Sequence, residues 1–167
     1  ESGVPTGYEA LLRWNHPVRG WISPAEFIPL AEECGAIGAI GDWVLETACR
    51  DLRSWNENGH AELYISVNLS SRQMVREDMV HRLLGVIRDT GVNPSNLKVE
   101  ITETSLMHDP QAARRQLEEI KARHPGLRIA IDDFGTGYSS LAYLSDFPVD
   151  LLKIDRRFVI NLDKGQN

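Results

Sequence analysis

Five short strand-like runs, separated by segments with helical periodicity, constrain the fold of this chain more than any other feature. The runs cover residues 7–13, 62–68, 97–102, 127–132 and 150–154. Regular alternation of strand and helix is typical of a parallel sheet, because each parallel pair of strands needs a crossover connection that a helix supplies. The sequence therefore predicts an α/β fold built on a parallel sheet.

The segments between the runs carry helix signals. Ser23, Pro24 and Glu26 predict the capped start of a helix that ends near Gly35. Apolar residues at helical spacing predict further helices at about 40–57 and 76–89, and from Pro110 to the residue before Pro125. A shorter turn or helix is expected over 139–144, and another helix from residue 156 onward.

Within the runs, charged and amide side chains fall on one parity and apolar side chains on the other. The polar set is Asn68, Glu100, Asp132 and Lys153, at intervals of 32, 32 and 21 residues. Because side chains alternate between the two faces of a strand, one face packs under helices and the other collects these groups. Strand–helix units wrapped into a barrel would bring them together at its C-terminal mouth, where barrel enzymes keep their chemistry.

The collected groups are hard oxygen ligands. Two carboxylates, an amide oxygen and the adjacent carboxylate of Asp133 suit Mg²⁺ or Mn²⁺. Taken singly, Asp132 reads as a helix or turn cap and Asn68 as a turn former. A purely structural role is harder to assign to Glu100, because burying a carboxylate inside an apolar run costs free energy unless the carboxylate is paired or bound to a metal. Their common placement in consecutive units favours a metal site.

A loop with two glycines follows the acidic end of the fourth run. It reads Asp132-Asp133-Phe134-Gly135-Thr136-Gly137-Tyr138-Ser139-Ser140. Glycine permits close backbone approach to a ligand, but Gly-Thr-Gly alone is a weak phosphate-loop signal. The position of this loop beside the carboxylates strengthens the phosphate-loop signal.

Composition indicates a packed domain and argues against nucleic-acid binding and membrane contact. Of 167 residues, 42 % are hydrophobic and the formal net charge is −6, so a packed domain is expected and nucleic acid is not a predicted partner. There is no run of about 18 apolar residues, so no direct membrane contact is predicted from this segment. Cys34 and Cys49 fall in separate predicted helices, which indicates buried free thiols in a reducing cytoplasm.

The motifs resemble those of a known family. Glu9-Ala10-Leu11-Leu12-Arg13-Trp14 is similar to the signature that names the EAL-domain family of bacterial cyclic di-GMP phosphodiesterases. The resemblance continues, in order, through Ser66-Val67-Asn68-Leu69-Ser70, Glu100-Ile101-Thr102-Glu103, the 132–140 loop and Lys153-Ile154-Asp155.

This resemblance implies a TIM-like (β/α)8 barrel with one antiparallel strand and hydrolysis of cyclic di-GMP to linear pGpG. It implies two ions, Mg²⁺ or Mn²⁺: the first held by Glu9, Asn68, Glu100 and Asp132, and the second bound or bridged by Asp133. Asp133 and Lys153 would be catalytic, with Lys153 near the attacking water, while Arg13 and Leu12 would contact substrate. Glu103 would hold the loop that contains Gly135 and Gly137. A homodimer and other signalling domains of the same parent protein are the implied partners, beside cyclic di-GMP.

Five strands are fewer than the eight of such a barrel. We therefore expect residues 1–167 to be a partial EAL domain that lacks the family's first and last strands and is inactive alone. One alternative is a catalytically silent EAL domain that acts as a cyclic di-GMP receptor or a protein-interaction scaffold. The intact name motif and loop favour catalysis over this. A second alternative is another metal-dependent barrel enzyme, enolising or decarboxylating, in which Lys153 would suit the chemistry.

Overall fold

A curled sheet of five parallel strands forms the centre of the structure. The computed structural model describes residues 3–135 and 145–157. The strands follow one another in the sheet in chain order: β1 (Gly7–Ala10), β4 (Tyr64–Leu69), β5 (Leu97–Thr102), β6 (Arg128–Phe134) and β7 (Leu151–Ile154). Every pairing in this sheet is parallel, which confirms the predicted α/β fold built on a parallel sheet. The antiparallel strand implied by the resemblance is not among these described strands.

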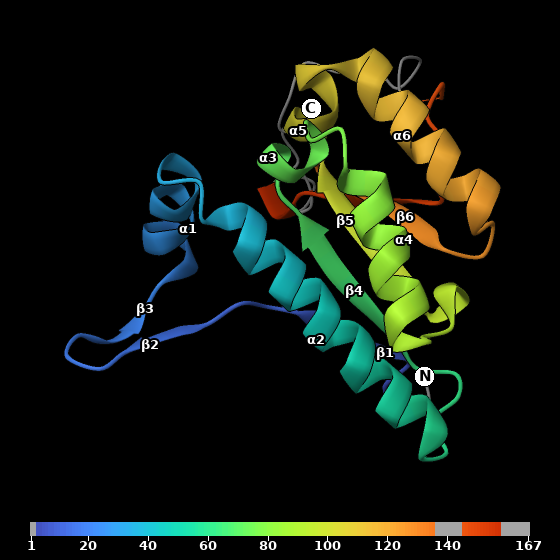
Figure 1. Cartoon of the computed structure of the whole chain (residues 1–167), viewed down its shortest axis with the longest axis horizontal. Coiled ribbons are helices and arrows are strands. Elements are labelled where there is room, and N and C mark those ends of the chain that lie inside the picture. The colour runs from blue at the N-terminus through green and yellow to red at the C-terminus, as the bar shows by residue number, and fades with distance from the viewer. Residues whose placement is uncertain (1–2, 136–144, 158–167) are drawn as a thin grey trace, which may run out of the picture.

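Helices cover one face of this sheet. Three long helices stand side by side on it in Figure 1, namely α2 (Ile37–Glu57), α4 (Met79–Thr90) and α6 (Pro110–Arg123). The core lies between them and the apolar parity of the strands: Val67, Val99 and Ile131 are at most 1 % exposed. The opposite parity therefore faces the inside of the curl, as the sequence predicts.

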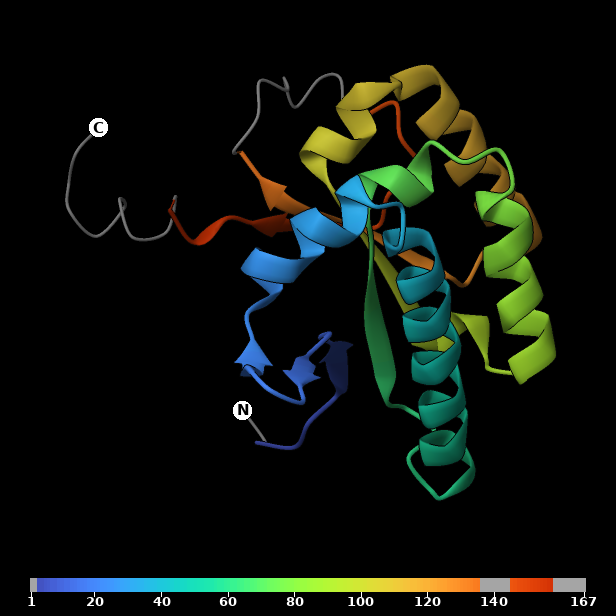
Figure 2. The ribbon, with the colours of Figure 1, turned by 60° about the vertical axis from the view of Figure 1, so that its left-hand side comes forward.

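A two-stranded hairpin projects from the sheet on the side away from α4 and α6 (Figures 1 and 2). It comprises β2 (Trp14–His16) and β3 (Gly20–Ile22) and leads into α1 (Pro24–Glu33). The expected strand 7–13 instead ends at Ala10. In the hairpin that follows, His16 Nδ1 accepts hydrogen bonds of 3.1 Å from the backbone N–H groups of Val18 and Arg19, which closes the turn.

Short helices at the carboxyl ends of the strands also differ from the expectation. The helix predicted from residue 76 begins at Met79. A short helix, α3 (Ser71–Met74), precedes it, and another, α5 (Glu103–His108), follows β5. A 3-10 turn, η1 (Pro94–Asn96), leads into β5. Each is too short for a periodic signal; α3 begins at a Ser70–Gln73 capping box instead.

Three further expectations concern the two cysteines, the helix over 139–144 and membrane-spanning segments. Cys49 is buried, but Cys34 is exposed at the end of α1, so its predicted burial is wrong. The helix expected over 139–144 lies outside the described residues. Among the described helices, none combines the length and the hydropathy needed to cross a membrane.

Candidate metal site at the carboxyl end of the sheet

The strand register places the predicted ligands on one face. Glu9 pairs with Ser66, Asn68 with Glu100, and Thr102 with Asp132. Paired residues of parallel strands point to the same face, as do residues two apart on one strand. Glu9, Asn68, Glu100 and Asp132 therefore share the inner face.

Three of these side chains converge. Oxygens of Glu9, Glu100 and Asp132 all lie within 4.8 Å of one another. Glu100 is 2 % exposed, Asp132 is half-buried and Glu9 is exposed, so the cluster opens toward β1. The Asn68 amide donates a hydrogen bond of 2.9 Å to Glu9, which adds the fourth predicted ligand to the rim.

The Lys153 ammonium lies among the three carboxylates. Its Nζ is 2.5 Å from Glu100, 3.0 Å from Asp132 and 3.9 Å from Glu9. Burial alone would lower the pKa of Lys153, but hydrogen bonds to Glu100 and Asp132 more than offset this and hold the pKa above its usual range. These oxygens thus already neutralise one positive charge, and carboxylate oxygens are donors of the type that divalent cations prefer.

A β-bulge presents Asp132 and Asp133 differently. The β6–β7 register shifts between Ile131 and Phe134, so that both aspartates stand opposite Lys153. Asp133 has a positive φ of 54°, and its backbone N–H donates to Asp132 Oδ1 at 2.9 Å. Bulges of this kind re-aim side chains next to active sites. Asp133 is accordingly adjacent to the three converging carboxylates but is not one of them.

The environment of Asp133 disfavours its charged form. Desolvation, and then the negative charges of Asp132 and Asp155, raise the pKa of the Asp133 carboxyl above its usual range. The charges of Lys153 and Arg157 act in the opposite direction. A nearby divalent cation would favour the ionised carboxylate for the same electrostatic reason.

Glu103 contacts the start of the predicted loop. It is the first residue of α5 and 1 % exposed, and its Oε2 accepts a hydrogen bond of 2.8 Å from the Gly135 N–H. This contact fits the loop-holding role that the resemblance implies for it. Gly137, the other predicted loop glycine, lies outside the described residues.

Two serines that sequence reasoning missed join neighbouring turns. Ser71 Oγ lies 2.7 Å from Ser105 Oγ, which in turn lies 2.6 Å from Thr102 Oγ1. The turn after β4, which follows Asn68, is thereby joined to the turn after β5. The Ser-Ser and Thr-Glu-Thr-Ser sequences at these points are the only signal, and they do not reveal which hydroxyls meet.

Arg13 and Leu12 lie just beyond the end of β1. Arg13 is exposed, and its guanidinium donates to the Leu12 carbonyl at 2.9 Å. Both line a cavity of about 320 Å³ that also borders Asn68, Ser71 and Ser105. The structure therefore puts a cation and an apolar side chain beside the cluster but not in contact with its carboxylates.

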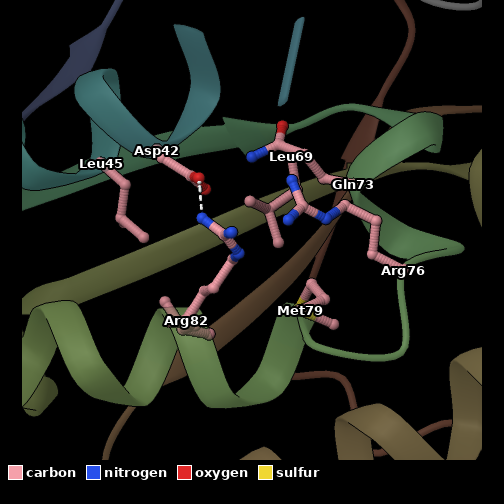
Figure 3. A pocket seen from close by; sticks show the side chains of 8 residues that line it. Asp42, Leu45, Leu69, Gln73, Arg76, Met79 and Arg82 are labelled. Carbon is pink, nitrogen blue, oxygen red and sulfur yellow. Dashed lines mark hydrogen bonds and ion pairs between the residues drawn. The ribbon is translucent and has the colours of Figure 1, made fainter. Parts of the chain in front are cut away.

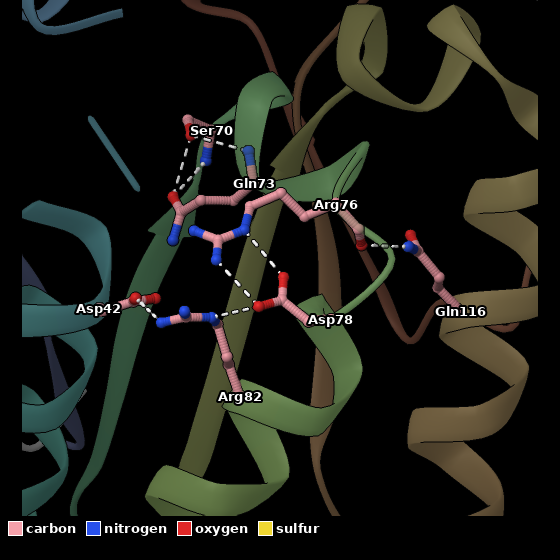
Figure 4. A network of polar contacts seen from close by, with 7 residues as sticks. All are labelled: Asp42, Ser70, Gln73, Arg76, Asp78, Arg82 and Gln116. Atoms are coloured by element: carbon pink, nitrogen blue, oxygen red, sulfur yellow. Dashed lines mark hydrogen bonds and ion pairs between the residues drawn. The ribbon is translucent and has the colours of Figure 1, made fainter. Parts of the chain in front are cut away.

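Polar contacts behind the β4 turn join α2 to the start of α4 and to the segment before it. Arg82 of α4 pairs with both Asp42 of α2 and Asp78, and Asp78 also accepts from Arg76 at 2.9 Å (Figure 4). These arginines hold the pKa of the exposed Asp78 below its usual range. Figure 3 shows Gln73 and Arg76 lining a pocket together with Asp42, Met79 and Arg82. The network supports the turn from behind and does not reach the carboxylate cluster.

The family comparison agrees with this geometry, since the EAL domain model matches residues 1–167. The chain belongs to the EAL family. A bifunctional diguanylate cyclase/cyclic di-GMP phosphodiesterase, MucR of Pseudomonas aeruginosa, is 47 % identical over 161 residues, which are 96 % of this chain and 23 % of MucR. NbdA of the same organism, a cyclic di-GMP phosphodiesterase, is 42 % identical over 158 residues, 95 % of this chain and 20 % of NbdA.

A solved EAL structure has the same fold. The MucR phosphodiesterase in complex with c-di-GMP superposes with a TM-score of 0.86 at 47 % identity, over 93 % of this chain and 62 % of that one. The chain thus spans about a fifth of the length of the curated relatives MucR and NbdA. The EAL domain described here has the parallel half-barrel of the family, with its signature acid Glu9 in the carboxylate cluster.

Proposed function

We propose that this EAL domain hydrolyses one phosphodiester bond of cyclic di-GMP, giving linear pGpG, with the help of divalent cations. The observation that carries the proposal is the convergence of Glu9, Glu100 and Asp132 within 4.8 Å at the carboxyl end of the sheet. The names of MucR and NbdA, and the c-di-GMP bound in the MucR structure, support the substrate.

The chemistry of the donors favours Mg²⁺ or Mn²⁺. Glu9, Asn68, Glu100 and Asp132 would hold one ion, and Asp133 would bind or bridge to a second. When bound, divalent ions would lower the pKa of a bound water and neutralise the negative charge that develops on the phosphoryl oxygens.

The remaining residues act on substrate and loop. Arg13 offers a fork of N–H donors to a substrate phosphate, and Leu12 an apolar contact in the adjoining cavity. Lys153 lies close enough to the cluster to orient the attacking water once its ammonium is free of Glu100. Glu103 keeps the Gly135 backbone, and with it the start of the loop, beside Asp133. A cytoplasmic homodimer attached to other signalling domains is proposed from the resemblance.

The test is an assay of the full-length protein with cyclic di-GMP and Mg²⁺. We expect pGpG to form, and Glu9→Ala to abolish turnover, because it removes one of three converging carboxylates. Glu46→Ala is the matched control, since Glu46 pairs only with Arg50 on the surface of α2 in the contacts of the described residues. Tight binding of cyclic di-GMP without turnover by the parent would select the receptor function instead. Turnover that survives Glu9→Ala would refute the metal assignment.

A further inference from the structure

Lys153 occupies the position in which a metal would contact the acidic cluster. Its ammonium contacts Glu100 and Asp132 directly and lies 3.9 Å from Glu9. These are the same three side chains whose oxygens converge. An ammonium and a divalent cation therefore compete for one set of oxygens.

The burial of Glu100 makes a counter-cation necessary at all times. Its side chain is 2 % exposed, and in the described part of the chain its ion pair is with Lys153. A buried carboxylate without a partner is strongly destabilising, so Lys153 leaves Glu100 only when another cation takes its place.

We propose that Lys153 is the built-in counter-cation of the cluster and determines its selectivity for divalent over monovalent ions. The inference rests on the proposed function, because it requires that the cluster takes a metal. Lys153 holds Glu9, Glu100 and Asp132 together without metal. Its ammonium leaves Glu100 when a divalent ion binds.

Charge and tethering explain the selectivity. A Na⁺ or K⁺ ion has the same single charge as the ammonium, so the exchange adds no positive charge to the cluster, whereas a divalent ion adds one. Because Lys153 is covalently tethered beside the cluster, its ammonium also contacts the oxygens without the loss of translational entropy that a free monovalent ion incurs on binding. A doubly charged ion gains attraction to all three carboxylates and displaces it.

The first test compares two lysine variants of the full-length protein by calorimetric titration with Mn²⁺. Lys153→Met should raise the Mn²⁺ affinity about tenfold, because no internal cation competes. Lys121→Met is the matched control: Lys121 makes a comparable ion pair of 2.6 Å with Asp150 near the start of β7, and its loss should leave Mn²⁺ affinity unchanged.

Monovalent ions provide a second arm. In Lys153→Met, Na⁺ should weaken Mn²⁺ binding more than tetramethylammonium does at equal ionic strength, because the larger cation does not fit between the carboxylates. In the parent protein the two salts should act alike. Equal behaviour of the two salts in Lys153→Met would contradict the selectivity claim.

A third arm needs no variant and remains decisive if Lys153→Met does not fold. The Nζ resonance of Lys153 in ¹⁵N-labelled parent protein should shift on addition of Mg²⁺, while that of Lys121 stays in place. An unchanged Lys153 resonance at saturating Mg²⁺ would overturn the displacement, as would a Mn²⁺ affinity of Lys153→Met equal to or below that of the parent. Metal binding with displacement but no pGpG formation would refute the proposed function alone; no metal binding at all would overturn both.

Discussion

Glu100 is the residue whose position most directly requires a cation. It stands in the middle of β5 between buried Val99 and Ile101, and it is itself 2 % exposed. Its side chain points to the inner face of the sheet, where Lys153 meets it. The cost of burying a lone carboxylate explains why an acidic residue in an apolar strand is informative even before a structure exists.

The two cysteines provide a residue-scale prediction. Burial raises the pKa of the Cys49 thiol from 9.0 to about 12, against a smaller lowering by a hydrogen bond with Thr90, whereas Cys34 is exposed. A thiol-reactive disulfide at pH 8 should therefore modify Cys34 within minutes and Cys49 only after denaturation. Peptide mass spectrometry of the full-length protein reads both sites.

The same shift has a consequence for pH. The neutral Cys49 thiol is favoured in the folded state, so its contribution to stability is complete below pH 9 and is lost between pH 9 and about 12, where the Cys49 thiol ionises in the unfolded chain but not in the folded one.

Cys34→Ser is the control for the labelling experiment. Rapid labelling of Cys49 in the native protein would contradict its burial.

At the scale of elements, close packing of α2 against α3 supports the turn that follows Asn68. A Cβ at Gly41 would overlap the side-chain amide of Gln73. Gln73 cannot simply swing away, because its Oε1 accepts from both the N–H and the hydroxyl of Ser70 at 3.1 and 2.9 Å. The absence of a side chain at Gly41 is therefore tied to the capping box of α3.

Gly41→Ala should destabilise the protein by about 1–2 kcal/mol in urea unfolding, since loss of the cap outweighs the helix propensity gained. Gly85→Ala is the matched control: Gly85 lies inside α4, and a Cβ there would have no heavy atom within 4 Å beyond its chain neighbours and the backbone of its own helix, so the change should stabilise by up to about 1 kcal/mol. Equal effects of the two substitutions would show that Gly41 has no packing role.

The hydroxyl contacts between the turns provide a second prediction at this scale. Ser105→Ala removes the contacts with both Ser71 and Thr102 and should destabilise by about 1–3 kcal/mol, with weaker Mn²⁺ binding because the turn after Asn68 loosens. Thr90→Val is the control, since the Thr90 hydroxyl donates to carbonyls of its own helix, far from the cluster. It should lower stability without changing Mn²⁺ affinity. An unaltered Mn²⁺ affinity of Ser105→Ala would show that the hydroxyl contacts between the two turns do not affect the carboxylate cluster.

Sequence reasoning predicted the elements whose signals are periodic and missed those set by single side chains. Alternation in β4, β5 and β6 identified both the core face and the residues on the inner face. The β2–β3 hairpin depends on His16 accepting two backbone hydrogen bonds, and the bulge at Asp132–Asp133 on pairing with a distant strand. Neither has a local pattern. The same holds for the Ser71–Ser105 contact, which joins residues 34 positions apart.

At the scale of the molecule, both edge strands of the described sheet lack a partner on one side. Leu151, Leu152 and Ile154 of β7 are 40–62 % exposed, and Tyr8 of β1 is 48 % exposed. Such edges offer unpaired backbone groups and apolar side chains to other segments. The chain covers 62 % of the MucR phosphodiesterase structure.

We therefore predict that residues 1–167, produced alone, show no measurable hydrolysis of cyclic di-GMP under conditions in which the full-length protein forms pGpG. Chromatographic separation of the nucleotides measures both. Mg²⁺-dependent turnover by residues 1–167 alone would contradict the prediction.

The central claim is that the inner face of this half-barrel holds a divalent cation between β1, β5 and β6. The most direct measurement is anomalous diffraction from crystals of the full-length protein grown with Mn²⁺. We predict an anomalous peak bonded to the carboxylates of Glu9, Glu100 and Asp132, with Lys153 withdrawn from Glu100. Crystals saturated with Mn²⁺ that show no peak at these three side chains, and Lys153 still on Glu100, would contradict it.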